Sequence, residues 1–157
     1  MASSDFDFLF GEWRVHHHKR VNPFDPADDH WVEFDTLTGA RPTLSGLGNI
    51  DETTGELPGS GPFTGMSLRL YDPAADRWGI WWASTGAPGV LDAPVYGRFE
   101  HGVGEFVGAA EHRGIPFLQR FRWLDVETPS PVWEQQFSFD GGATWDGVNW
   151  RMEHTRT

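Results

Sequence analysis

Residues 138–145 read SFDGGATW, a hairpin turn between two strands rich in aromatic residues. Asp and Gly supply the backbone conformations that tight hairpins need. Similar units, each an aromatic strand followed by a compact turn, fill most of the chain, whereas a helical apolar stripe is hard to find after residue 11. The sequence therefore predicts an all-β protein whose sheet closes around an aromatic interior.

Period-two alternation of apolar and polar residues predicts ten strands. They are expected at residues 12–20, 30–37, 43–50, 64–71, 77–84, 95–100, 104–111, 116–124, 132–139 and 148–155. Compact turns join several neighbouring pairs, so a single closed antiparallel up-and-down barrel is the simplest topology. With no tract that resembles a linker, we expect residues 1–157 to form one domain.

The two ends of the expected barrel differ. Ser4 and Asp7 have the spacing of a capping pair, which predicts a short N-terminal helix that ends at Gly11 and plugs the barrel floor with its Phe side chains. Long Gly- and Pro-rich connections at 21–29, 51–63 and 85–94 share the opposite end in an up-and-down meander. We expect that end to be the mouth of a cup.

Composition narrows the classes of function. Nine Trp, twelve Phe and two Tyr provide a large core, and the absence of Cys excludes disulfides, thiol nucleophiles and thiolate metal sites. A net charge of −11 repels nucleic acids and anionic membrane surfaces. Acidic residues near the start of the chain, and no apolar run of membrane-spanning length, predict a cytoplasmic protein.

If the apolar parity of each strand faces inward, the interior can be assigned. The inward side chains are then Trp13, Val15, His17, Met66, Leu68, Leu70, Trp78, Ile80, Trp82, Phe117, Gln119, Phe121, Trp123, Trp133, Gln135, Phe137, Trp150, Met152 and His154. The opposite parity carries Arg14, Arg69, Arg98, Arg120, Arg122, Glu134, Arg151 and Glu153, as a solvated outer wall would.

Four polar residues on the inward face are candidates for ligand contact. A buried polar group without a partner costs roughly 1–3 kcal/mol, so His17, Gln119, Gln135 and His154 each need a neighbour, a water or a ligand. His17 and Gln119 lie toward the mouth, and His154 lies near the floor. The full set of candidate ligand-binding residues is His17, Trp78, Trp82, Gln119, Trp133, Gln135, Trp150 and His154.

Three other motifs are better explained by structure than by chemistry. His16 and His18 share one side of a strand, but they belong to the outer parity and have no adjacent carboxylate pair, so no metal site is expected. Residues 138–145 match the Asp-box pattern and resemble the turns of sialidases that carry it. In those turns the residues of the pattern stabilise the turn itself. The acid pairs Asp140 and Asp146 or Glu134 and Glu153 do not flank a cleft as glycosidase carboxylates must.

Several stretches resemble a bacterial family of uncharacterised lipocalin-like (calycin) domains. They are the opening FLFGEW at 8–13, LRLYDP at 68–73 with the Trp-rich 78–82, GRFE at 97–100, and WEQ at 133–135 before the Asp-box. The resemblance implies a ten-stranded barrel with a central cavity. Nitrobindins, which are haem-binding calycins, are similar more loosely: they also open with a Gly-x-Trp strand and carry a haem-ligating His near the C-terminus, where this chain has His154.

These observations favour binding of a small, largely apolar or aromatic ligand in the barrel cavity, without a cofactor. Three alternatives stay open. The first is an isomerase, cyclase or hydrolyase that uses His17 or His154 as a general acid or base. The second is a haem protein of nitrobindin type that uses His154. The third is a filled barrel that acts through its surface, for example as a homodimer through Trp81 and Tyr96.

Overall fold

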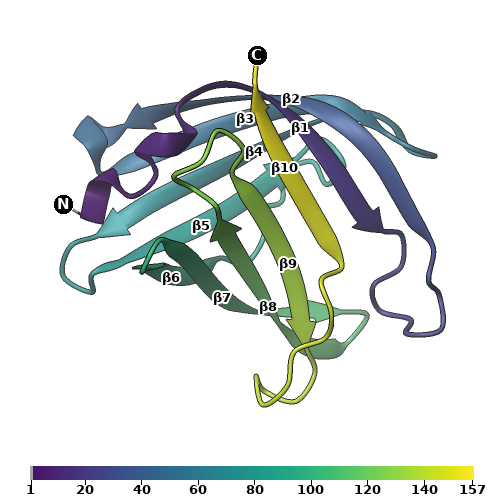
Figure 1. Cartoon of the computed structure of the whole chain (residues 1–157). Helices are drawn as coiled ribbons and strands as arrows, with labels where there is room; N and C mark the ends of the chain where they lie inside the picture. Colours follow the sequence, from purple (N-terminus) through teal and green to yellow (C-terminus); the bar gives the residue numbers. More distant parts are fainter. Residues whose placement is uncertain (1) are drawn as a thin grey trace.

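Residues 2–157, the part of the chain that this computed structural model describes, fold into a closed barrel of ten antiparallel strands (Figure 1). The strands are β1 (Gly11–Arg20), β2 (Trp31–Thr43), β3 (Gly48–Leu57), β4 (Gly61–Asp72), β5 (Arg77–Ser84), β6 (Val95–Glu100), β7 (Val103–His112), β8 (Ile115–Leu124), β9 (Val132–Ser138) and β10 (Trp150–Arg156). Each pairs with its neighbours in sequence, and β10 pairs with β1 to close the barrel. The predicted class and up-and-down topology are confirmed.

The N-terminal segment plugs one end of the barrel, as predicted, although it is not the expected helix. It consists of two three-residue 3-10 turns, η1 (Ala2–Ser4) and η2 (Asp7–Leu9). Phe6, and not Ser4, occupies the cap position of η2, so the predicted position of the cap at Ser4 is wrong. Tertiary packing, rather than local capping, holds so short a segment. We call this end the floor and the opposite end the mouth.

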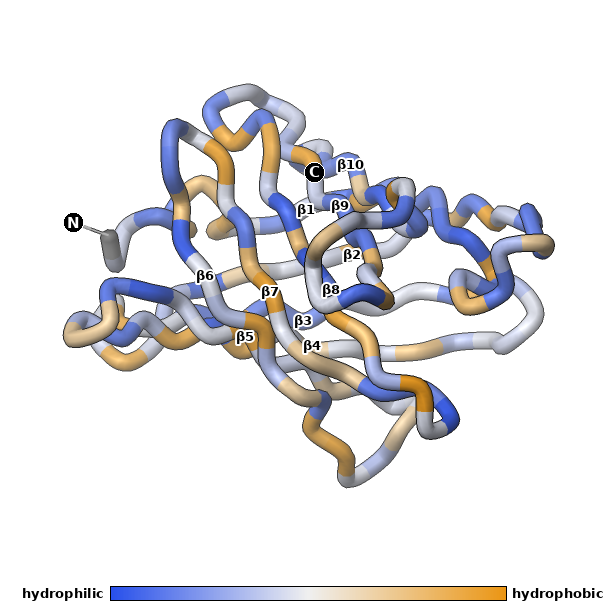
Figure 2. Tube along the Cα trace, turned by 90° about the horizontal axis from the view of Figure 1, so that it is seen from below, coloured by the Kyte–Doolittle hydropathy of each residue, from blue (hydrophilic) through white to orange (hydrophobic). Residues whose placement is uncertain are grey.

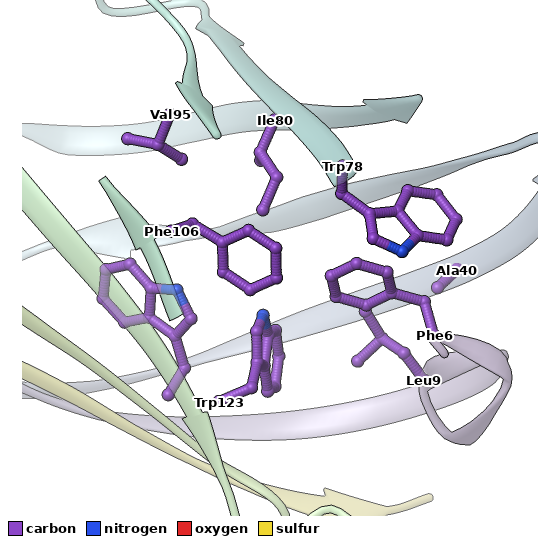
Figure 3. Packing of buried hydrophobic residues seen from close by; sticks show 9 residues of the cluster. Phe6, Leu9, Ala40, Trp78, Ile80, Val95, Phe106 and Trp123 are labelled. Carbon is purple, nitrogen blue, oxygen red and sulfur yellow. The ribbon is translucent and has the colours of Figure 1, made fainter. Parts of the chain in front are cut away.

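Aromatic packing seals the floor (Figure 3). Phe6 is completely buried, with its ring centroid 4.9 Å from that of Trp78 and 5.8 Å from that of Phe106. Burying one Phe side chain contributes roughly 1.5–3 kcal/mol. Leu9 enters the same cluster, and its carbonyl accepts a 2.7 Å hydrogen bond from the indole of Trp13 on β1. The plug is therefore part of the hydrophobic core.

Most predicted faces are confirmed, but the inward parity assigned to β4 is wrong. Arg69 points into the barrel and is only 4% exposed, whereas Leu68 lies on the outer wall and is partly exposed. Met66 and Leu70 share the outward parity of Leu68. The pairing register explains the error, because Leu68 lies between Ile50 on β3 and Trp81 on β5, so the outer wall is itself apolar there. Figure 2 shows that hydrophobic and hydrophilic residues are interspersed along the strands.

The predicted connection at 51–63 is also wrong, because most of it is strand. β3 continues to Leu57, a tight turn follows, and β4 begins at Gly61. The inward residues of β3 are polar: Asn49, Asp51 and Thr53 are all buried. A strand whose inward face is polar lacks the hydrophobic alternation that identifies strands in a sequence. The long connections at the mouth are therefore those after β1, β5 and β9.

Candidate functional site

The barrel interior has two chemically different walls. The wall formed by β1–β4 carries most of the inward polar side chains, beside the apolar Trp13, Val15 and Phe34. The wall formed by β5–β10 is mostly aromatic and aliphatic, with Gln119, Gln135 and His154 as polar exceptions. The polar wall contributes His17, Thr36, Thr38, Asn49, Asp51, Thr53, Ser67 and Arg69, and the apolar wall contributes Trp78, Ile80, Trp82, Phe106, Phe121, Trp123, Trp133, Trp150 and Met152. An amphipathic interior suits a ligand with one polar side or end and an aromatic body.

His17 belongs to the wall and holds Trp150 in place. The indole N–H of Trp150 donates to Nδ1 of His17 at 3.1 Å, so the ring proton lies on Nε2, which donates to Oγ1 of Thr36 at 2.8 Å. The imidazole also stacks on Phe34, with ring centroids 4.4 Å apart. Burial lowers the pKa of His17 to about 3, so the ring is neutral at physiological pH. Both nitrogens are occupied by neighbours in the barrel wall.

Arg69 and Asp51 form a buried ion pair lower in the polar wall. Nη2 of Arg69 lies 2.5 Å from a carboxylate oxygen of Asp51, and Nη1 donates to Oδ1 of Asn49 at 3.0 Å. The guanidinium also lies over the ring of Phe6, 5.1 Å from its centroid. Among the described residues, Nε of Arg69 has no hydrogen-bond partner. The pair thus links the polar wall to the floor and leaves one buried donor unused.

His154 lies at the floor, on β10. Its Nδ1–H donates to the carbonyl oxygen of Pro131 at 3.0 Å, which leaves Nε2 as an acceptor. Burial lowers the pKa of His154 to about 4. The rings of Trp13 and Trp123 flank the imidazole, with centroids 5.9 and 5.1 Å away. His154 is thus a neutral, enclosed group, deeper in the barrel than His17, as the sequence predicted.

Several inward side chains are only partly buried. Phe121 and Met152 face inward near the middle of the barrel, yet both are partly exposed. Trp82 is also partly exposed, and its indole lies close to Gly65, where an added Cβ would come within 2.1 Å of the ring. Only glycine at this position lets the ring lie against β4.

The two inward glutamines have different roles in the wall. Gln135 is 9% exposed, and its amide donates to Oδ1 of Asn149 at 3.0 Å. Gln119 is partly exposed, and no side-chain hydrogen bond joins it to another residue in the described part of the chain. Gln119 is therefore the glutamine with free donors and acceptors for a ligand.

The connection after β1 crosses part of the mouth. Phe24 stacks on the imidazole of His112, with centroids 3.9 Å apart, and contacts Phe117 and Phe137 at 5.2 Å. Arg20 holds this connection by donating to the carbonyl oxygen of Asp28 at 2.8 Å. Contacts between the β1–β2 connection and β7–β9 restrict entry on that side of the mouth.

Two surface cavities lie outside this interior. One, of about 550 Å³, lies between the N-terminal turns and the β2–β3 connection at the floor, and Ser4 and Phe10 are among the residues that line it. The other, of about 450 Å³, lies where β2 and β3 part, and Thr36 and Gly55 form the last pair of their register. Neither is lined by the aromatic wall, so the candidate site is defined by the inward side chains.

The sequence-predicted residues therefore occupy three levels. Trp82, Gln119 and Trp150 lie in the upper part of the barrel and are partly exposed. His17, Trp133 and Gln135 are buried in its wall, and Trp78 and His154 belong to the floor, where the indole of Trp78 donates to Asp5 at 3.2 Å. Sequence reasoning missed Lys19 and Ser67, as well as the pair of Asp51 and Arg69. Lys19 continues the inward parity of His17 by one more step, a signal that was present in the sequence.

Comparisons with known proteins add no functional assignment. Neither the protein-family models nor the curated proteins include a match to this chain. Within residues 2–157, no group of three or more His, Cys, Asp or Glu side chains is placed to bind a metal ion. The same residues contain no helix that is long and apolar enough to cross a membrane.

Proposed function

We propose that the barrel binds a small, largely apolar or aromatic molecule between its polar and aromatic walls. The observation that carries this proposal is the partial exposure of Phe121 and Met152 inside a closed barrel with a sealed floor. Apolar walls with few polar groups are typical of small-molecule sites. The net charge of −11 disfavours anionic ligands and favours neutral or cationic ones. A closed ten-stranded barrel is also compatible with the proposed resemblance to lipocalin-like domains.

Adjacent tryptophans on β5 provide a matched test of the site. Trp82 faces the interior, whereas Trp81 faces outward and packs against Tyr96 with ring centroids 6.0 Å apart. The probe is the neutral dye N-phenyl-1-naphthylamine, whose binding is measured by energy transfer from tryptophan. Trp82→Ala should weaken binding by about tenfold or more, since a well-packed aromatic contact contributes on the order of 1–3 kcal/mol. Trp81→Ala should bind like the parent, and equal losses in both variants would place the probe elsewhere.

Substitutions of the two inward glutamines distinguish a residue that contacts the ligand from one that stabilises the barrel wall. Gln119→Leu should change the dye affinity and leave the melting temperature level or raised, because the substitution removes no side-chain hydrogen bond to any of residues 2–157. Gln135→Leu should lower the melting temperature, because it leaves the amide oxygen of Asn149 buried without its donor. Loss of stability in Gln119→Leu would assign that residue to the core instead. Native mass spectrometry of protein from its own host would identify a retained ligand.

The alternative functions have less support from the same residues. A histidine that works as a general acid or base needs a pKa near the working pH, whereas burial places the pKa of His17 near 3 and that of His154 near 4. Haem also fits poorly beside His154, because the imidazole is 3% exposed and enclosed by Trp13 and Trp123. A hemin titration should therefore give no Soret shift that depends on His154, and a shift lost in His154→Ala would restore the haem hypothesis.

A further inference from the structure

Lys19 is the only lysine of the chain, and it is placed on the inner wall of the barrel. Every other basic side chain, histidine apart, is an arginine. Lys19 follows Trp13, Val15 and His17 on the inward parity of β1, and it pairs with Trp150 of β10 at the mouth end of the seam that closes the barrel. The side chain is only partly exposed. The protein thus presents its single lysine amine to the space between the walls.

The surroundings of this amine are aromatic rather than acidic. Nζ lies over the indole of Trp150, 4.8 Å from the ring centroid. No ion pair or hydrogen bond joins Nζ to another residue within 2–157, whereas Arg14 on the outer face of the same strand pairs with Asp35 at 3.5 Å. Burial alone lowers the pKa of Lys19 from its ordinary value. A larger share of this amine is therefore neutral, and so nucleophilic, than in an exposed lysine.

We propose that Lys19 forms an imine with the carbonyl carbon of an aromatic aldehyde held between the walls. The inference rests on the proposed ligand-binding function and names the chemical class of one ligand. The lone pair of Nζ attacks the carbonyl carbon and a C–N bond forms, while the carbonyl oxygen takes up a proton. The carbinolamine then loses water to give the C=N bond. Amine and aldehyde are converted to imine and water, and neither an oxidant nor a reductant is required.

The neighbouring side chains favour an aromatic aldehyde over a small anionic carbonyl compound. The indole of Trp150 is fixed by its hydrogen bond to His17 and by the edge of Trp133, 5.3 Å away between centroids. A flat ring stacked on this surface brings an attached carbonyl to the amine of Lys19, which lies over the same indole. Holding two reacting groups together raises the rate of their reaction strongly.

Reductive trapping tests the proposal directly. The full-length protein is incubated with 2-naphthaldehyde and sodium cyanoborohydride, which reduces an imine to a stable amine, and the adduct is located by peptide mass spectrometry. We expect one naphthylmethyl group on Lys19, and none at that position in Lys19→Arg, because a guanidinium stays protonated. The matched control is the double variant Lys19→Arg, Arg14→Lys, whose only lysine lies on the outer face of the same strand. It should be labelled at least about tenfold more slowly than the parent.

A parallel titration keeps the two proposals separate. The alcohol 2-naphthalenemethanol has the same ring system but cannot form an imine, and its binding is followed by quenching of tryptophan fluorescence. If the alcohol binds and Lys19 is labelled no faster than the lysine of the double variant, the imine proposal is refuted and the ligand-binding function stands. If the alcohol does not bind and Trp82→Ala has no effect on any probe, the ligand-binding function itself fails.

Discussion

Removal of Asp51 should destabilise the barrel strongly, because it leaves the charge of Arg69 buried without its counter-ion. The two side chains are 6% and 4% exposed and lie 2.5 Å apart. Arginine does not lose its proton in proteins, so in Asp51→Ala the guanidinium keeps its charge with only the amide oxygen of Asn49 as a partner. Breaking a buried ion pair in this way costs about 3–5 kcal/mol. This is a large part of the roughly 5–15 kcal/mol that stabilises a typical domain.

Two further variants serve as controls for the stability loss expected in Asp51→Ala. Glu105→Ala removes an outer-wall carboxylate, 51% exposed and 3.8 Å from Arg122, and should cost less than about 1 kcal/mol. The double variant Asp51→Leu, Arg69→Met replaces the buried pair with apolar side chains, and should recover most of the stability lost in Asp51→Ala. Urea unfolding followed by tryptophan fluorescence gives all of these free energies. Equal costs for Asp51→Ala and Glu105→Ala would show that Arg69 faces water, and the inward assignment of β4 would then be wrong.

Three further predictions concern pH, the plug and the Asp-box turn. In the folded state the pKa values of His17 and His154 are about 3 and about 4, below the value of 6.5 in the unfolded chain. The folded state therefore binds fewer protons than the unfolded state. The free energy of unfolding should fall as the pH drops from 6.5 toward 4, by about 1.4 kcal/mol per pH unit for each histidine. Urea unfolding at pH 6, 5 and 4 gives the dependence of the unfolding free energy on pH, and His154→Asn should remove half of the histidine contribution to it. An unchanged pH dependence would contradict the assignment of His154 as a buried, neutral histidine. Phe6→Ala should cost about 3–5 kcal/mol by urea unfolding, and a loss below about 1 kcal/mol would mean that the floor does not depend on the plug. Asp140→Ala removes the carboxylate that accepts a 2.9 Å hydrogen bond from the backbone amide of Thr144, so this amide should exchange hydrogen faster. The affinity for the dye should stay unchanged. Weaker dye binding would show that the Asp-box turn belongs to the ligand site.

The sequence was sufficient to predict the barrel wherever one face of a strand is clearly apolar. The strands at 77–84 and 95–100 coincide with β5 and β6 residue for residue. The prediction failed at β3, whose inward face is polar, and at β4, where a polar inward face is combined with an apolar outward face. Alternation separates the two faces of a strand, but it does not say which of them is inside. Arg69 was therefore assigned to water, although its strand turns it toward Asp51.

The candidate site was predictable to the extent that it is aromatic. Trp82 and Trp150 were identified because large apolar side chains dominate an alternation pattern. The polar wall could not be found in this way, since burial of Asp51 and Arg69 depends on their mutual contact across two strands, and no local pattern encodes the register. Gln119 and Gln135 look alike in the sequence, and only the position of Asn149 separates them.

The hydrogen bonding of the polar wall also restricts how a ligand can lie in the barrel. The bonds of His17 to Thr36 and of Thr38 to Thr53, at 2.8 and 2.6 Å, use these side chains within the wall itself. Lys19 has no hydrogen-bond or ion-pair partner among residues 2–157, and its amine lies near the mouth, next to the indole of Trp150. A ligand whose ring lies on the aromatic wall therefore has a polar contact available at the seam of β1 and β10, in addition to Gln119 on β8. Such a ligand joins the first and last strands of the barrel, so the same contacts that hold it should also oppose opening of the barrel.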